Sequence, residues 1–321
     1  MQTILAVTIP FFALVLCGYL AARARFLPES AIPGLNGFVL FFALPCLLYR
    51  FGASLPVRHL LDPVVIVVYL GCAMAMVFGT IAATRSARIA TKDAAFGALT
   101  ATFPNTGFMG VPLLAVLLGP EAAGPVLTTV LVDLLITSSI CISLAHAQER
   151  VGASFAADIL RALRGALGNP LPWAIVLGMA ASLSEFRLPG PLDTVVRMLA
   201  DAATPVALFT IGTVLWRAGA HLHGRTPPRL FVPLALIKLL VHPLLVLGVG
   251  SAAIALGAPL STFTLSVLVL AAALPSASSV SLLAERYGAD NGRIARAIVT
   301  STVLAFVTFT LAAWLAQLVL R

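Results

Sequence analysis

Charged side chains are scarce in this sequence. Only 10% of its 321 residues are Asp, Glu, Lys or Arg, whereas 60% are hydrophobic, and the mean hydropathy is +1.05. Soluble globular domains carry about 25% charged residues, so the composition excludes a soluble domain and indicates a polytopic membrane protein. The formal net charge of +8 does not indicate nucleic-acid binding, because the charges are scattered singly between apolar runs.

Cysteines are few, and their spacing is not that of a metal site. Cys17, Cys46, Cys72 and Cys141 all lie within apolar segments, and no two of them form a Cys-x-x-Cys pair. Buried free cysteines behave as small hydrophobic side chains. We therefore expect four buried thiols and neither disulfides nor metal ligands.

Motifs for nucleotide binding and covalent catalysis are missing as well. The sequence contains neither GxxxxGK[ST] nor GxGxxG, and the serines around Ser276 have no His–Asp partner placed for nucleophilic catalysis. His221 and His223 form a His-x-His pair, but it lies in a loop without cysteine or acidic partners and is a weak metal signal. We expect no enzymatic activity, no catalytic residue, no metal site and no cofactor.

Long apolar runs dominate the chain instead. A helix of about 20 apolar residues crosses a hydrocarbon core of about 30 Å. Ten candidate spans follow: residues 4–22, 34–53, 63–84, 94–118, 124–146, 170–184, 191–216, 231–256, 262–285 and 294–319. No basic stretch precedes the first run, so we interpret it as a transmembrane helix rather than a signal peptide.

The basic residues favour one orientation of these spans. Fourteen of the 20 Lys and Arg residues fall in one set of alternate loops and five in the other, while Lys238 lies within a span. Loops rich in Lys and Arg face the cytoplasm. This bias places both termini on the non-cytoplasmic side of a plasma membrane.

Prolines recur in register in the two halves of the chain. The first, second and fourth spans contain Pro10, Pro45 and Pro104, and the sixth, seventh and ninth contain Pro172, Pro205 and Pro275. Five spans in each half invert the second half relative to the first. We therefore predict an all-α fold of two inverted five-helix repeats, residues 1–146 and 170–321. Residues 147–169 would form a cytoplasmic connector along the membrane surface.

Two of these prolines interrupt their spans at corresponding positions, in Pro104-Asn105-Thr106-Gly107 and in Pro275-Ser276-Ala277-Ser278. Unwound backbone in lipid leaves polar groups unpaired at several kcal/mol each, unless it is buried or lines a cavity. Paired interruptions mark the substrate site of secondary transporters. Freed N–H groups and the positive ends of half-helices favour an anion. The alternative is an ordinary proline kink whose hydroxyls bond to helix carbonyls.

Ionisable residues inside spans form a second group of candidates, because the bilayer makes them costly. Asp133 lies in the fifth span, where it would couple transport to a proton or cation or else make a structural hydrogen bond. Lys238 and His242 share one face of the eighth span. They would compensate the charge of an anion or of Asp133, or Lys238 would extend to the cytoplasmic surface. Asp201, in the seventh span, would have such a coupling role or make a local structural bond with the proline kink of its span.

Several motifs resemble the auxin efflux carrier family, which includes the plant PIN carriers. They are Phe103–Thr106 with Met109–Leu114, Ala273–Pro275 with Ala284–Tyr287, Leu35–Val39 with Phe42–Pro45, Asn169–Pro170, and Asp201–Ala203 with Pro205 and Gly212. The resemblance covers essentially the whole chain. The connector is short, as in bacterial members, and serines follow Pro275 where the plant carriers have a different run.

The resemblance implies a fold like that of bile-acid symporters and sodium–proton antiporters, with helices four and nine crossed. Helices one, two, six and seven would form a scaffold, against which the rest moves as an elevator. An organic anion would bind beside the crossing, where Asn105 matches the family's substrate-contacting asparagine. The resemblance also implies a homodimer through helices two and seven, in the bacterial inner membrane.

Members that resemble this chain are associated with malonate, malate and auxin. We therefore expect a secondary transporter for a small mono- or dicarboxylate, and coupling to protons or to sodium is left open. A cation/proton antiporter that uses Asp133 is the alternative, and the lack of carboxylates at the two interruptions disfavours it.

Overall fold

The protein is a helical membrane protein. The structure is a computed structural model that describes residues 2–86, 89–146, 155–220 and 226–319, and every regular element in these ranges is a helix. Within them, seven helices are long and apolar enough to cross a membrane, or eight if the bent pair Ala156–Leu167 and Pro170–Leu183 counts as one span. The prediction of a polytopic membrane protein is confirmed. The predicted fourth and ninth spans contain only short apolar helices, Thr106–Leu118 and Thr262–Ala273.

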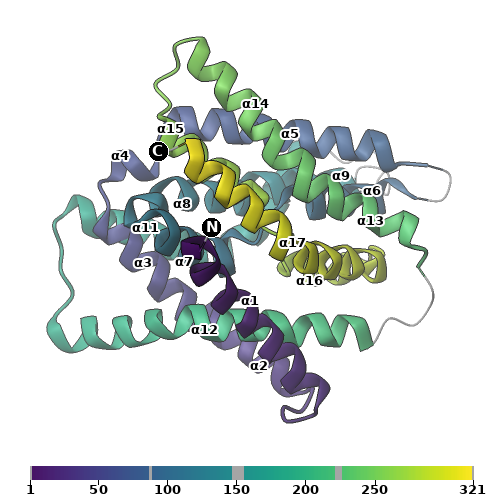
Figure 1. Ribbon diagram of the computed structural model, residues 1–321, viewed down its shortest axis with the longest axis horizontal. Helices are drawn as coiled ribbons and strands as arrows, with labels where there is room; N and C mark the ends of the chain where they lie inside the picture. The colour runs from purple at the N-terminus through teal and green to yellow at the C-terminus, as the bar shows by residue number, and fades with distance from the viewer. Residues whose placement is uncertain (1, 87–88, 147–154, 221–225, 320–321) are drawn as a thin grey trace.

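The helices are labelled in chain order in Figure 1. The first half comprises α1 (Gln2–Arg23), α2 (Ala31–Phe38), η1 (Val39–Ala43), α3 (Leu44–Ser54), α4 (Val57–Leu60), α5 (Pro63–Thr84), α6 (Thr91–Thr102), η2 (Thr106–Gly110), α7 (Val111–Leu118), η3 (Pro120–Ala122), α8 (Ala123–Leu131), η4 (Val132–Thr137) and α9 (Ser138–His146). The second comprises α10 (Phe155–Leu167), α11 (Pro170–Leu183), α12 (Gly190–Ala220), α13 (Pro228–Leu236), η5 (Ile237–Val241), α14 (His242–Ala255), α15 (Thr262–Ala273), α16 (Ser279–Arg286) and α17 (Asn291–Val319).

Local sequence signals define several helix starts. The Asp62 carboxylate accepts a hydrogen bond from the Val64 amide at 2.8 Å, and Asn169 caps α11 in the same way through the Leu171 amide at 3.0 Å. In both helices a proline occupies the first position, where its missing N–H has no intrahelical partner to lose. Such caps satisfy backbone donors that lipid cannot satisfy.

Four helices form one closely packed group. The long α12 runs across one side of the molecule in Figure 1 and packs against α1 and α3, while α3 also packs against α11. The α1–α12 contact is made through Gly18 and Gly212, since a Cβ at either would collide with backbone of the other helix. Gly52 and Gly178 play the same part between α3 and α11. Small residues at such contacts let transmembrane helices approach closely.

The remaining helices pack against one another and against this group. The helix α5 contacts α6 and α14, α14 contacts α15, and α13 contacts α17. Three helix runs outside the group of four contain a π-helical turn, η2 before α7, η4 between α8 and α9, and η5 between α13 and α14. Single π turns within α-helices are frequent at functional sites, and nothing in the sequence analysis foresaw them.

The thiols differ in their surroundings. All four cysteines are free, as expected, and Cys72 and Cys141 are buried. Cys17 is exposed and Cys46 is half-buried, so the expectation of four buried thiols was wrong for these two. Both lie on membrane-spanning helices whose outer faces carry large apolar side chains such as Leu16 and Phe42. Lipid can cover a thiol there without any protein contact.

Candidate functional site

The two interrupted segments meet and exchange backbone hydrogen bonds. The Asn105 amide donates to the Pro275 carbonyl at 2.8 Å, and the Ala277 amide donates to the Phe103 carbonyl at 2.9 Å. Pro104 and Ser276 thereby form a short antiparallel bridge. Helix α6 ends before this bridge and η2 begins after it, just as α15 ends and α16 begins on the other chain segment. The alternative of ordinary proline kinks in continuous helices was therefore wrong.

The pairing explains how unwound backbone is tolerated at this depth. Each segment supplies the donors and acceptors that the other has freed, so no lipid-facing polar group results. A third helix adds to this. The Ser276 amide donates to the Ser301 hydroxyl of α17 at 3.1 Å, and that hydroxyl donates to the Ile298 carbonyl. Ser301 was missed by the sequence analysis, because a single serine in a span gives no signal of its own.

The two segments pair at Phe103–Asn105 and Pro275–Ala277, and we call this place the crossing. Most of the predicted substrate-binding residues lie there, inside the protein. Two are half-buried, Gly107 and Ser278, and the others are buried: Pro104, Asn105, Thr106, Pro275, Ser276 and Ala277. The two glycines of the first segment differ. A Cβ at Gly110 would lie 2.6 Å from the Leu274 side chain, whereas a Cβ at Gly107 would meet open space. Only Gly110 is therefore needed for close packing, and Gly107 borders a gap.

Two helical segments start at the crossing without a side-chain cap, and one buried hydroxyl there has no partner within the described part of the chain. The helical segments η2 and α16 both begin there, and neither has a side chain that caps its first turn. The Ser276 hydroxyl is buried and has no partner among the described residues. Helix starts carry partial positive charge and free N–H groups. The arrangement can therefore accept a small anion without any charged side chain.

A second polar cluster lies buried among α5, η4, η5 and α14. The Tyr69 hydroxyl donates to Asp133 Oδ2 at 2.7 Å, and Lys238 Nζ lies 3.0 Å from His242 Nδ1. The centroids of the Tyr69 and His242 rings are 6.1 Å apart. None of the four side chains is exposed. Tyr69 was missed, although a tyrosine alone in an apolar run is a signal that could have been used.

This second cluster touches the crossing through Lys238. Its ammonium donates to the Ala272 carbonyl at 2.6 Å, in the last turn of α15 before the break. Lys238 is fully buried, so the interpretation in which it extends to the cytoplasmic surface was wrong. Asp133 Oδ1 and His242 Nε2 are buried and have no hydrogen-bond partner among the described residues.

The other candidates lie elsewhere. Asp201 of α12 forms an exposed ion pair with Arg50 of α3 at 3.4 Å, rather than the expected bond near the proline of its helix. His221 and His223 lie outside the described residues, as does the beginning of the connector, residues 147–154. The rest of the connector forms α10, which packs against α9.

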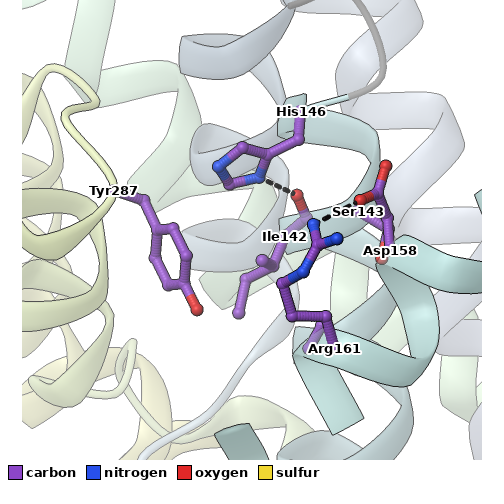
Figure 2. A pocket seen from close by; sticks show the side chains of 7 residues that line it. Ile142, Ser143, His146, Asp158, Arg161 and Tyr287 are labelled. Atoms are coloured by element: carbon purple, nitrogen blue, oxygen red, sulfur yellow. Dashed lines mark hydrogen bonds and ion pairs between the residues drawn. The ribbon is translucent and has the colours of Figure 1, made fainter. Parts of the chain in front are cut away.

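A cavity of about 150 Å³ lies between α9, α10 and the end of α16 (Figure 2). His146 Nδ1 donates to the Ile142 carbonyl at 2.8 Å, and its ring packs edge-on against Tyr287. On the opposite wall Arg161 pairs with Asp158 at 2.8 Å. None of the predicted site residues lines this cavity, so it is separate from the crossing.

The family of the chain follows from its sequence match over nearly its whole length. Residues 3–313 match the model of a family described as membrane transport protein. The chain belongs to this family. The match and the carriers among its relatives confirm the resemblance to the auxin efflux carriers.

Relatives in the family come from bacteria, archaea and plants. A Rhizobium meliloti (strain 1021) protein named "Putative malonate transporter" is 29% identical over 315 residues, covering 97% of this chain and 95% of the relative. The uncharacterized transporter YfdV of Escherichia coli (strain K12) is 28% identical and covers 93% of each chain. Auxin efflux carrier component 8 of Arabidopsis thaliana is 23% identical and covers 95% of each. Membership of a transporter family agrees with the expectation of no enzymatic activity.

Proposed function

We propose that the protein is a secondary active transporter for a small organic anion, of the mono- or dicarboxylate class. The observation that carries this proposal is the crossing of the two broken helices, with two uncapped helix starts, the unpartnered Ser276 hydroxyl and no carboxylate. A bound carboxylate would accept hydrogen bonds from the free amides and from Asn105, Thr106, Ser276 and Ser278. The gap beside Gly107 is where the rest of the substrate would lie.

The substrate class draws support from the relatives as well as from the site. Relatives carry the names malonate transporter and auxin efflux carrier, and malonate, malate and auxin share carboxylate groups. The crossing offers neutral donors, which bind a carboxylate without the cost of burying a countercharge. A cation would find no acidic side chain there. These features favour the anion over the alternative of a cation/proton antiporter.

The transport mechanism would be of the elevator type. The group formed by α1, α2, α3, α11 and α12 would be the scaffold, and the crossing with its surrounding helices would move past it. The close glycine contacts within the scaffold suit a rigid body. Each of these contacts joins the first predicted span of one half to the second predicted span of the other, α1 to α12 and α11 to α3. This exchange is what two inverted five-helix repeats, ten spans in all, would produce.

Further features belong to the same proposal. Both termini would lie on the non-cytoplasmic side of the bacterial inner membrane, and residues 147–169 would lie in the cytoplasm. A homodimer would form through the second and seventh predicted spans, that is α2–α3 and α12, whose outer faces expose apolar side chains such as Val195 and Met198.

The anion site can be tested by ligand-induced stabilisation of the purified protein. Malonate, malate, indole-3-acetate and acetate would be screened by thermal shift, since a ligand at 100 times its Kd stabilises the folded state by about 2.7 kcal/mol. We expect at least one dicarboxylate or monocarboxylate to raise the melting temperature. The Asn105→Ala variant should lose most of this shift, while without ligand it should melt at the same temperature as the unchanged protein.

The matched control is Asn36→Ala, which removes the same side chain from α2, outside the crossing. It should respond to the carboxylate like the unchanged protein. Equal stabilisation of Asn105→Ala and Asn36→Ala would contradict the site. A lack of response to every carboxylate would contradict the proposed substrate class.

A further inference from the structure

The buried cluster of Tyr69, Asp133, Lys238 and His242 is too costly to serve packing alone. An acid and a base are held without contact to water, and they are close enough for their opposite charges to interact. Removing two charges from water costs several kcal/mol per ion, and apolar residues of similar volume stabilise such positions as well or better. Ionisable residues within a membrane-spanning region therefore indicate function.

The hydrogen bonds of the cluster are also incomplete. A structural polar network satisfies all of its members, whereas here Asp133 Oδ1 and His242 Nε2 have no partner among the described residues. His242 Nδ1 faces the Lys238 ammonium, so an added proton on this ring would be repelled. Asp133 Oδ2 accepts from the Tyr69 hydroxyl, whereas Oδ1 accepts no hydrogen bond from the described residues. Oδ1 is the atom that can take a proton.

Other titratable groups surround Asp133. They come from α5, α9, η5 and α14 and comprise Tyr69, Cys72, Cys141, Lys238 and His242. The helix α8 contributes none, because its sequence AGPVLTTVL contains no ionisable residue. On α10, Asp158 and Arg161 pair with each other beside the separate cavity.

One hydrogen bond connects the cluster to the crossing. Lys238 donates to the Ala272 carbonyl, one of the last carbonyls of α15, where the helix dipole leaves partial negative charge. While Asp133 is ionised, it balances the charge of Lys238. When Asp133 is protonated, that balance is lost, and an uncompensated positive charge remains next to the crossing.

We propose that Asp133 is a proton-binding site which couples proton movement to anion binding at the crossing, with Lys238 as the link. A proton on Asp133 Oδ1 leaves the cluster with one net positive charge and strengthens anion binding. By reciprocity, a bound anion strengthens proton binding. One proton and one anion therefore travel in the same direction, as in a symporter. This inference rests on the proposed anion transport.

A proton fits this site better than a metal cation. Sodium, like other hard cations, is held by several oxygen ligands. Here a single carboxylate is accompanied by an ammonium group and a ring nitrogen, and the ammonium would repel a metal ion. Within the described ranges there is also no group of three or more His, Cys, Asp or Glu side chains that could hold a metal.

The first test measures malonate affinity of the purified protein against pH, over the neutral to mildly alkaline range in which both malonate carboxyl groups stay ionised. One linked proton should raise the Kd by up to about tenfold per pH unit. The Asp133→Asn variant should bind malonate with a Kd independent of pH. Asp201→Asn, which removes an exposed carboxylate from α12, is the matched control and should keep the pH dependence.

Three outcomes of this test would overturn the proposal. They are a pH-independent Kd in the unchanged protein, a retained pH dependence in Asp133→Asn, and a Kd that falls when sodium replaces choline in the buffer. The last would identify a sodium site in place of the proton site.

The second test does not depend on a substrate. Infrared difference spectra of the reconstituted protein between acidic and alkaline buffer should show a carboxylic-acid band that Asp133→Asn lacks and Tyr69→Phe shifts. Absence of this band overturns the proton site even if malonate binds. Its presence without binding of malonate leaves the proton site standing and contradicts the proposed substrate instead. Tyr69→Phe also serves as the milder variant should Asp133→Asn fail to fold.

Discussion

Gly107 and Gly110 lie three residues apart in the sequence, but their surroundings differ. The position of a side chain at Gly107 is open, while at Gly110 it is filled by Leu274 of the opposite segment. One glycine therefore borders the proposed substrate gap, and the other lets the two segments pack. Substitutions at these two positions can therefore distinguish an effect on substrate binding, at Gly107, from an effect on stability, at Gly110.

We expect Gly107→Val to weaken carboxylate binding at least tenfold, because its side chain would fill the gap, with stability changed by no more than about 0.5 kcal/mol. Gly110→Val should destabilise the protein by about 1–3 kcal/mol through overpacking against Leu274. Ligand titration and thermal unfolding of both variants check this. Equal effects of the two substitutions on binding would show that the gap is not used.

Lys238 allows a prediction on stability. Lys238→Met removes the countercharge of Asp133 and leaves the Ala272 carbonyl without its donor, while Asp133 avoids the full cost of an unpaired buried charge by taking up a proton. We expect a loss of about 1–3 kcal/mol. The double variant Asp133→Asn with Lys238→Met removes both charges and should regain part of this loss. The measurement is the melting temperature of each purified variant. A double variant as unstable as the single one would mean that the two charges do not compensate each other.

At the residue scale, the sequence predicted the unusual groups but not their partners. Asn105, Asp133 and Lys238 were found because polar residues in an apolar run are costly. Ser301 and Tyr69 were not, since a hydroxyl in a span can always bond to its own helix. Which of them turns to a neighbour is decided by packing between distant segments.

Helices as elements were predictable from long apolar runs and from proline and asparagine at their starts. The breaks after Phe103 and Leu274 followed from proline in the middle of a run. The π turns η1, η2, η4 and η5 were not foreseen, because they add one residue to a turn without changing the composition. Their positions depend on how the two groups of helices pack.

The glycine contact between α1 and α12 yields a prediction at the same scale. Gly212→Leu would force the helix backbones apart, because a Cβ at this position already collides with the Val15 carbonyl. We expect a loss of at least about 1–3 kcal/mol. Gly248→Leu on α14, which has open space around it, is the control and should leave the melting temperature unchanged. A similar loss in both variants would argue against a close α1–α12 contact.

For the whole molecule, the orientation in the membrane can be checked directly. Ser30 and Ser184 are both exposed, in loops that the charge bias assigns to opposite sides. In a background without the four native cysteines, Ser184→Cys should react with a membrane-impermeant maleimide in intact cells, and Ser30→Cys should react only after the cells are opened. The reverse pattern would invert the topology, and labelling of both in intact cells would contradict the number of spans between them.

The bridge between Pro104 and Ser276 also bears on how the chain is made. Its two partners are far apart in sequence, so during synthesis the segment around Asn105 enters the membrane long before α15 exists. Until then its unwound backbone has no partner, and contacts of such long sequence separation form late. The first half alone would hold polar backbone exposed in the bilayer and would be a target for quality-control proteases. Docking of the second half onto the first would therefore both complete the fold and create the proposed binding site.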